Sequence, residues 1–144
     1  MGKNILIVSA AMSFQKSIGD ALQLNGLKVT STTEGFHALS LLEGDKFSLA
    51  IVGPDVRVMS SLEVISLMRT KFNKDILPII RILDNEDRNG SGSKSEQVNQ
   101  EMFDSLKCGA NEAICKPDIR KLVDKVKALT TQTATQTAQK ISTK

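Results

Sequence analysis

The sequence predicts an α/β protein in which helices cover both faces of one five-stranded parallel sheet, a doubly wound arrangement. Five short apolar runs alternate along the chain with five segments whose apolar residues recur at helical spacing. The runs hold Ile, Val and Leu at consecutive positions, which is typical of strands buried on both faces. The chain has 144 residues, enough for one domain with a substantial core.

The five apolar runs are short enough to be strands rather than helices. They occupy residues 5–8, 27–31, 47–52, 76–82 and 112–115. The third run, FSLAIV, is the most continuous, whereas the second, LKVTS, is polar at several positions and predicts a weaker strand. The fifth, EAIC, predicts a short strand.

The first two intervening segments have the apolar spacing and the end signals of helices. Residues 13–26 predict the first helix, with Ser13 as a suitable N-cap and Gly26 as a suitable C-terminal stop. Residues 34–44 predict a second helix, which ends at its glycine. The apolar positions expected on its buried face include Phe36, Leu39 and Leu42.

The other three helices are expected over residues 61–73, 96–110 and 118–130. Ser60 or Ser61 is a suitable N-cap for the first of these, and Gly109 closes the second. The apolar stripe of the 96–110 helix is Val98, Met102, Phe103 and Leu106. The stripe of the last helix is Ile119, Leu122, Val123, Val126 and Leu129.

Two polar segments lie outside this core. Residues 84–95 (DNEDRNGSGSKS) form a Gly- and Ser-rich loop, which is either a surface insertion or an element that docks a partner. Residues 131–144 are rich in Thr, Gln and Ala and bury too little to order themselves. We therefore expect a folded domain over 1–130 and a tail over 131–144, either a frayed extension of the last helix or a linker.

The composition argues against several classes of function. Five Phe without Trp or Tyr do not suit a stacking surface for nucleic acid, and a net charge of +3 is mild enough for a solvated helix face to explain. Cys108, Cys115 and His37 form no metal-binding pattern or disulfide framework. No apolar run approaches the length of a membrane span, so we expect a cytoplasmic protein.

The opening ILIV, the strand spacing and the segment GANEAICKP (109–117) resemble the receiver domains of two-component response regulators. The resemblance covers residues 3–129 and implies the CheY-like, flavodoxin-like (βα)5 fold. A working receiver accepts a phosphoryl group from a histidine kinase on an aspartate at the end of its third strand. It needs Mg²⁺, which prefers carboxylate ligands, and the family supplies an acidic pair after the first strand.

The resemblance places this chemistry on residues that cannot perform it. The acidic pair falls on Ser9 and Ala10, and the phospho-acceptor falls on Gly53. The hydroxyl residue that ends the fourth strand falls on Leu83, and the aromatic residue of the fifth strand falls on Ala113. Only Lys116 and Pro117 match, and the family implies a cis bond between them. We therefore predict a pseudo-receiver, with no enzymatic activity, metal or cofactor.

Two alternatives stay open at this stage. Asp55 or Asp84 lies near a strand end and is a candidate for a displaced phospho-acceptor. Lys116 has either an inherited structural role or a role in binding an anion beside free backbone N–H groups, which makes a small-ligand sensor the second hypothesis. No nucleotide-binding glycine motif supports an enzyme or a nucleotide sensor.

The first hypothesis is a module that binds other signalling proteins without phosphorylation. In receivers the partner face is formed by the fourth helix, fifth strand and fifth helix, which here are residues 97–107, 112–115 and 119–127. The exposed candidates on this face are Gln100, Phe103, Lys107, Arg120, Asp124 and Lys127. Phe103 is the best candidate for an anchor, because aromatic residues dominate interface energetics. The sequence leaves open the partner, the oligomeric state and an effector domain after Lys144.

Overall fold

The computed structural model describes residues 3–83, 94–115 and 118–142, and for residues 94–95 and 131–142 it describes the backbone alone. Its strands are β1 (Asn4–Val8), β2 (Lys28–Thr32), β3 (Leu49–Val52), β4 (Ile79–Leu83) and β5 (Glu112–Cys115). Its helices are α1 (Met12–Leu24), α2 (Gly35–Gly44), α3 (Ser61–Lys71), α4 (Lys94–Cys108) and α5 (Ile119–Ser142).

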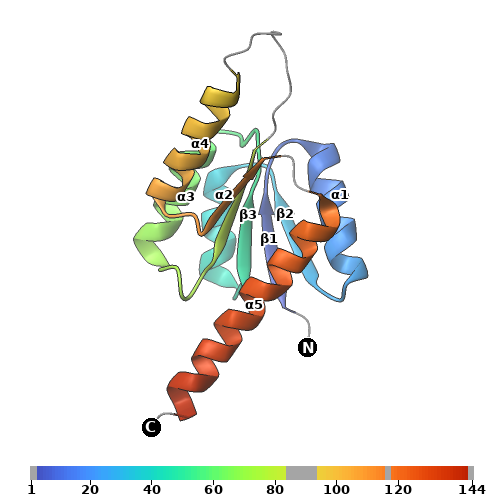
Figure 1. The fold of residues 1–144 in the computed structure, drawn as a ribbon, viewed down its shortest axis with the longest axis vertical. Coiled ribbons are helices and arrows are strands. Elements are labelled where there is room, and N and C mark those ends of the chain that lie inside the picture. The colour runs from blue at the N-terminus through green and yellow to red at the C-terminus, as the bar shows by residue number, and fades with distance from the viewer. Residues whose placement is uncertain (1–2, 84–93, 116–117, 143–144) are drawn as a thin grey trace.

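The strands form one parallel sheet in the order β2-β1-β3-β4-β5, and helices cover both of its faces (Figure 1). This confirms the predicted doubly wound, flavodoxin-like α/β fold. Val8 of β1 lies opposite both Thr32 of β2 and Val52 of β3, so these three strands end level with one another. The loops that follow them therefore meet at one edge of the sheet.

The core has two layers because successive strand side chains point to opposite faces. In β1, Ile5 and Ile7 pack toward α1 and α5, whereas Leu6 and Val8 pack toward α2 and α3, and all four are fully buried. The same alternation directs Arg81 of β4 to the α3–α4 face, because its neighbours Ile80 and Ile82 belong to the α1–α5 layer.

The helix ends agree with the sequence signals in two places and differ in one. Gly26 ends α1 with φ +82°, and the N–H groups of Gly26 and Leu27 donate to the Gln23 and Leu22 carbonyls, which is a Schellman motif. Ser60 caps α3 in a reciprocal capping box with Glu63, with both hydrogen bonds 3.1 Å long. The predicted Ser13 cap is wrong: α1 begins at Met12 after Ala11, so Ser13 already lies inside the first turn.

Two phenylalanines from the apolar stripes of predicted helices are exposed. Phe36 is 59% exposed, because α2 presents Gly35, Ala38 and Leu42 to the core instead. Phe103 is 56% exposed and Leu106 is 43% exposed, because α4 turns the fully buried Ser105 toward the protein interior. Two of the four members of this stripe therefore lie on the surface, and Phe103 is exposed as expected of a partner candidate.

The fourth strand is shorter than predicted. The apolar run that starts at Ile76 enters the sheet only at Ile79. The Asn73 carboxamide oxygen accepts hydrogen bonds from the Asp75 and Ile76 N–H groups, at 3.0 and 2.9 Å, and this turn delays the strand. Ile76 is left 58% exposed.

The backbone of α5 continues as a helix through residues 131–142 and extends past the sheet (Figure 1). Of the two alternatives for the tail, the backbone adopts the helical extension. The boundary of the folded domain at residue 130 stays a prediction. Within the described ranges, no helix combines the length and the apolar character needed to cross a membrane.

Candidate functional site

The edge at which the strands end brings together three of the predicted site positions. Ser9 and Ala10 follow β1, and Gly53 follows β3, where its N–H donates to the Val8 carbonyl at 2.9 Å. Leu83 ends β4 and is buried. Ala113 lies apart from this edge, because it pairs with Arg81 two residues before the end of β5. Lys116, Pro117 and the bond between them lie outside the described residues, as does Asp84.

The ring of Phe14 on α1 fills the space beside Gly53. A Cβ built on Gly53 would lie 2.4 Å from Cε2 and 2.8 Å from Cζ of Phe14, closer than real Cβ contacts. Gly53 does not have a positive φ, so glycine is needed here for space rather than for backbone freedom. Any residue with a side chain at this position requires Phe14 to move.

Hydrogen bonds within the protein occupy the polar groups around Gly53. The Ser9 hydroxyl is fully buried, donates to the Pro54 carbonyl and accepts from the Ala11 N–H at 3.2 Å. The Gln15 amide donates to the Ser9 carbonyl at 2.9 Å and to the Thr32 carbonyl at 3.2 Å. These contacts connect the ends of β1, β2 and β3 through side chains, without a carboxylate.

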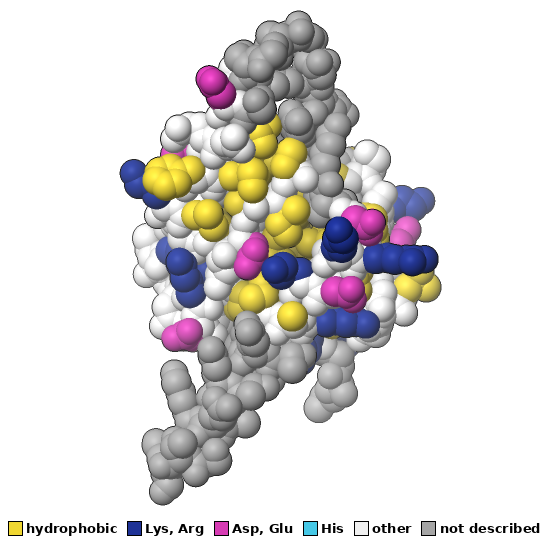
Figure 2. Space-filling view, in the orientation of Figure 1, with side chains coloured by type: hydrophobic (Ala, Val, Ile, Leu, Met, Phe, Trp, Pro, Cys, Tyr) yellow, Lys and Arg dark blue, Asp and Glu magenta, His cyan; other side chains and the backbone are white. Residues whose placement is uncertain are grey.

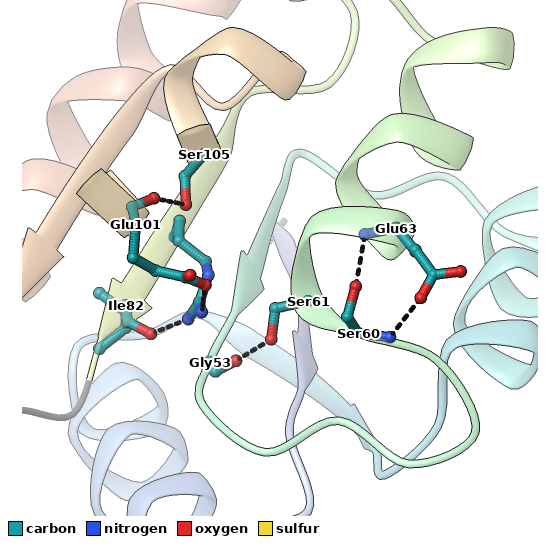
Figure 3. A network of polar contacts seen from close by, with 8 residues as sticks. Gly53, Ser60, Ser61, Glu63, Ile82, Glu101 and Ser105 are labelled. Atoms are coloured by element: carbon teal, nitrogen blue, oxygen red, sulfur yellow. Dashed lines mark hydrogen bonds and ion pairs between the residues drawn. The ribbon is translucent and has the colours of Figure 1, made fainter. Parts of the chain in front are cut away.

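The loop after β3 is attached on both of its sides. The Asp55 carbonyl accepts from the Ala10 N–H at 2.5 Å, and the Ser61 hydroxyl of α3 donates to the Gly53 carbonyl at 2.9 Å (Figure 3). Asp55 and Val58 have φ angles of 60° and 78°, which is costly for a β-branched residue such as Val58. The loop therefore holds a strained conformation through contacts to β1 and α3.

Asp55 is the candidate for a displaced acceptor that lies within the described residues, and this role stays a prediction. Asp55 is exposed, and its backbone carbonyl accepts from the Ala10 N–H. Across the described residues, no group of three His, Cys, Asp or Glu side chains is arranged to hold a metal ion. That Ser9 and Ala10 stand at the metal-ligand positions of a receiver stays a prediction.

Arg81 forms a buried ion pair that the sequence analysis missed. Its side chain is 7% exposed, and its Nη2 donates to Oε2 of Glu101 on α4 at 2.9 Å. Figure 3 shows Glu101 and Ser105 reaching from α4 toward the end of β4, near Ile82, whose carbonyl accepts from Arg81 Nη1. Burial lowers the pKa of Arg81, and Glu101 opposes that effect. The only sequence signal was one charged residue inside the apolar run ILPIIRI.

All six partner candidates are exposed, and they lie on α4 and α5. The Lys107 ammonium lies 5.6 Å from the centre of the Phe103 ring, and the Gln100 amide donates to Asp104 at 2.9 Å. Lys127 donates to the Asn25 side chain at 3.0 Å. Figure 2 shows apolar side chains gathered between α4 and α5 on this face, and the exposed members include Phe103, Leu106 and Ile119.

The comparisons with known proteins identify the fold. No family model matches the chain. A receiver domain from Methanospirillum hungatei JF-1 aligns with a TM-score of 0.75 and 22% identity over 94% of this chain and 99% of that one. The Francisella response regulator 1452 receiver domain aligns with a TM-score of 0.74 and 18% identity over 92% and 99%. The chemotaxis response regulator CheY4 of Vibrio cholerae aligns with a TM-score of 0.68 and 20% identity over 88% and 99%.

Proposed function

We propose that this chain is a pseudo-receiver, a protein-binding module that keeps the receiver fold and works without phosphorylation. The observation that carries the proposal is the position of the Phe14 ring in the space that a side chain at residue 53 would need. A receiver requires an acceptor carboxylate in that space. Here the Phe14 ring occupies that space, and Gly53 carries no side chain.

The surrounding contacts support the same proposal. Phosphoryl transfer to a carboxylate depends on Mg²⁺, and Mg²⁺ depends on oxygen ligands that keep it close to octahedral geometry. Ser9 is the one oxygen-bearing side chain at the acidic-pair positions, and its hydroxyl already donates to the Pro54 carbonyl. A cation there would find only the lone pairs of a neutral hydroxyl, which already accepts from the Ala11 N–H, and no negative charge.

Without a covalent switch, the module acts through a constitutive surface. We assign this role to the face of α4, β5 and α5, where Phe103, Leu106 and Ile119 are exposed. Exposed aromatic and aliphatic side chains inside a polar rim are typical of the central anchors of an interface. The partners are other signalling proteins, and the place of action is the cytoplasm.

Capture experiments with matched variants test this function. The wild-type domain, Phe103→Ala and Leu24→Ala are immobilised and exposed to extract from the cells that produce the protein. Leu24 is 87% exposed on α1, so it serves as an apolar surface control away from the assigned face. We expect Phe103→Ala to weaken capture of the same proteins about fivefold or more, and Leu24→Ala to leave it unchanged.

Circular dichroism checks that each variant is folded, because Phe103 lies largely outside the core. Equal capture by folded wild type and Phe103→Ala would exclude this residue as the anchor. Phosphate-affinity electrophoresis after treatment with acetyl phosphate tests the other half of the proposal. A shifted band in the wild-type protein would show a displaced acceptor, because Gly53 has no side chain to phosphorylate, and it would contradict phosphorylation independence.

A further inference from the structure

We propose that the buried ion pair between Arg81 and Glu101 sets the rotation of α4 about its own axis, so that the apolar side of this helix stays on the surface. Arg81 comes from β4 and Glu101 from α4, and Nη2 lies 2.9 Å from Oε2. The apolar side of α4 belongs to the assigned partner face. The effect of the pair on partner binding therefore rests on the proposed function, whereas its effect on the orientation of α4 does not.

α4 turns polar side chains toward the sheet and apolar ones toward solvent. Ser105 is fully buried, and Glu101 points to the buried guanidinium of Arg81 (Figure 3). Phe103 is 56% exposed and Leu106 is 43% exposed. Within residues 96–108, whose side chains the structure describes, no apolar side chain is fully buried. A helix that covers a sheet normally has the opposite arrangement.

A rotation of α4 by one residue would exchange its two sides. Glu101 and Ser105 are four residues apart and therefore share one side of the helix. Met102 and Leu106 follow them by one residue each, so they form an apolar row displaced by about 100°. The rotation would carry Leu106 to the place of Ser105, and Phe103 to the place of Met102. Periodicity alone favours this rotated orientation, so a tertiary contact must favour the observed one.

The Arg81 guanidinium is that contact. Its side chain is 7% exposed and lies on the α3–α4 face of the sheet. Nη1 donates to the Ile82 carbonyl, and Nε has no hydrogen-bond partner within the described residues. Rotation of α4 by one residue would replace the Glu101 carboxylate with Met102. A buried cation without its counter-charge is costly, and this cost disfavours the rotated orientation.

Replacing the cation by an apolar side chain removes this cost. α4 would then gain by turning Met102 and Leu106 toward the sheet and the Glu101 carboxylate toward water. The Glu101 side chain is already 39% exposed, so it reaches solvent with little movement. Buried ion pairs contribute little net stability, and their best-attested use is to select one packing arrangement over another. The Arg81–Glu101 pair therefore selects the side of α4 that a partner meets.

A single tryptophan reports the orientation of α4 without any partner. The chain has no Trp, so Phe103→Trp introduces a unique fluorophore on the exposed side of α4. We expect its emission to resemble that of indole in water and acrylamide to quench it readily. Adding Arg81→Met should shift the emission to shorter wavelength and reduce quenching about twofold, because rotation carries the indole to the half-buried place of Met102.

Two controls separate rotation of α4 from a general change in the protein. Leu24→Trp places the fluorophore on α1, where Leu24 is 87% exposed, and its emission should be the same with and without Arg81→Met. Arg81→Lys keeps a cation for Glu101, so the tryptophan at residue 103 should stay exposed in that variant. Cooperative urea unfolding shows that each variant is folded. NMR supplies a second measurement: the Leu106 methyl groups should gain NOEs to the α2–α3 core layer in Arg81→Met.

Unchanged emission, quenching and Leu106 NOEs in folded Arg81→Met would overturn the proposal, as would an equal emission shift in Arg81→Lys. In the capture experiment described above, Arg81→Met should weaken binding about threefold, because it turns Phe103 and Leu106 away from the partner. A shift in emission with unchanged capture would support the role of the ion pair and contradict the assigned partner face. The two proposals therefore fail on different measurements.

Discussion

Phe14 and Gly53 are complementary across the gap between α1 and the end of β3, since the ring occupies the volume that the glycine leaves empty. The nearest ring atom would be 2.4 Å from a Cβ at residue 53. The pair explains why the strand LAIV ends in glycine although the backbone there has an ordinary φ. It also means that the two residues contribute to stability together rather than separately.

Gly53→Ala should lower the free energy of unfolding by about 1–3 kcal/mol, because the added methyl overlaps the Phe14 ring. Phe14→Ala alone should also be destabilising, since the half-buried ring packs against the α1–α5 layer. In the Phe14→Ala background, the cost of Gly53→Ala should nearly disappear. Urea unfolding of the four proteins gives the coupling free energy.

Gly44→Ala is the matched control for that cycle, because its added methyl meets nothing within 4 Å. It should leave stability unchanged or raise it slightly. Additive effects of Phe14→Ala and Gly53→Ala would show that the ring does not fill the acceptor position.

The wild-type protein and Gly53→Asp should both be insensitive to Mg²⁺ with beryllofluoride. An aspartate at residue 53 would still lack the carboxylates that hold the metal, because Ser9 and Ala10 stand at those positions. Two-dimensional NMR spectra with and without the additives should overlay. Saturable shifts confined to the loops after β1 and β3 would contradict this prediction.

Ser60→Ala should destabilise the protein by about 1 kcal/mol, because it removes one half of the capping box at the start of α3. Ser13→Ala should change stability by only a few tenths of a kcal/mol, because Ser13 lies inside the first turn of α1. Thermal or urea unfolding compares the two. If Ser13→Ala cost more than Ser60→Ala, Ser13 would be the N-cap of α1, as the sequence alone predicted.

Glu101→Ala should destabilise the protein by about 1–3 kcal/mol, because it leaves the buried Arg81 guanidinium without its carboxylate. Because the Glu101 side chain is 39% exposed, the expected loss of stability is smaller than for breaking a fully buried ion pair. Arg81→Met replaces the cation by an apolar side chain and leaves Glu101 unpaired, but because the Glu101 side chain is 39% exposed and stays hydrated, this variant should cost less than Glu101→Ala. Unfolding free energies of the single variants and of the double variant distinguish these effects.

The two substitutions should not be additive: Glu101→Ala should lower the free energy of unfolding by less in the Arg81→Met background than in the wild-type protein. Arg81 Nε has no hydrogen-bond partner within the described structure, which adds to the gain from its replacement. Strong destabilisation by Arg81→Met would mean that the guanidinium also stabilises the end of β4 through contacts other than its ion pair with Glu101.

The alternating pattern of strands and helices was predictable because it depends on local periodicity. Short runs of Ile, Val and Leu exclude most other arrangements, and Gly26 and Ser60 mark helix ends through backbone chemistry within a few residues. Phe36 was assigned to the buried face of its helix wrongly for the same local reason. Helical spacing shows which apolar residues share one side of a helix, but it does not show which of two adjacent sides packs against the sheet.

The candidate site also combines features that the sequence predicts with features that depend on tertiary packing. The predicted loss of the acceptor and of the acidic pair rests on Ser9, Ala10 and Gly53, which can be placed from the sequence once the strands are placed. The ring of Phe14 beside Gly53 and the Gln15 amide across three strand ends could not be read, since they depend on how α1 packs on the sheet.

By itself, the sequence determined the order of the elements and the parallel sheet, because both depend on residue type and spacing along the chain. The tertiary structure alone decided what fills the space beside Gly53 and which side chains of α4 face outward. These features depend on contacts between residues far apart in sequence, such as Phe14 with Gly53 and Arg81 with Glu101. Their distances are set only when the helices pack on the two faces of the sheet.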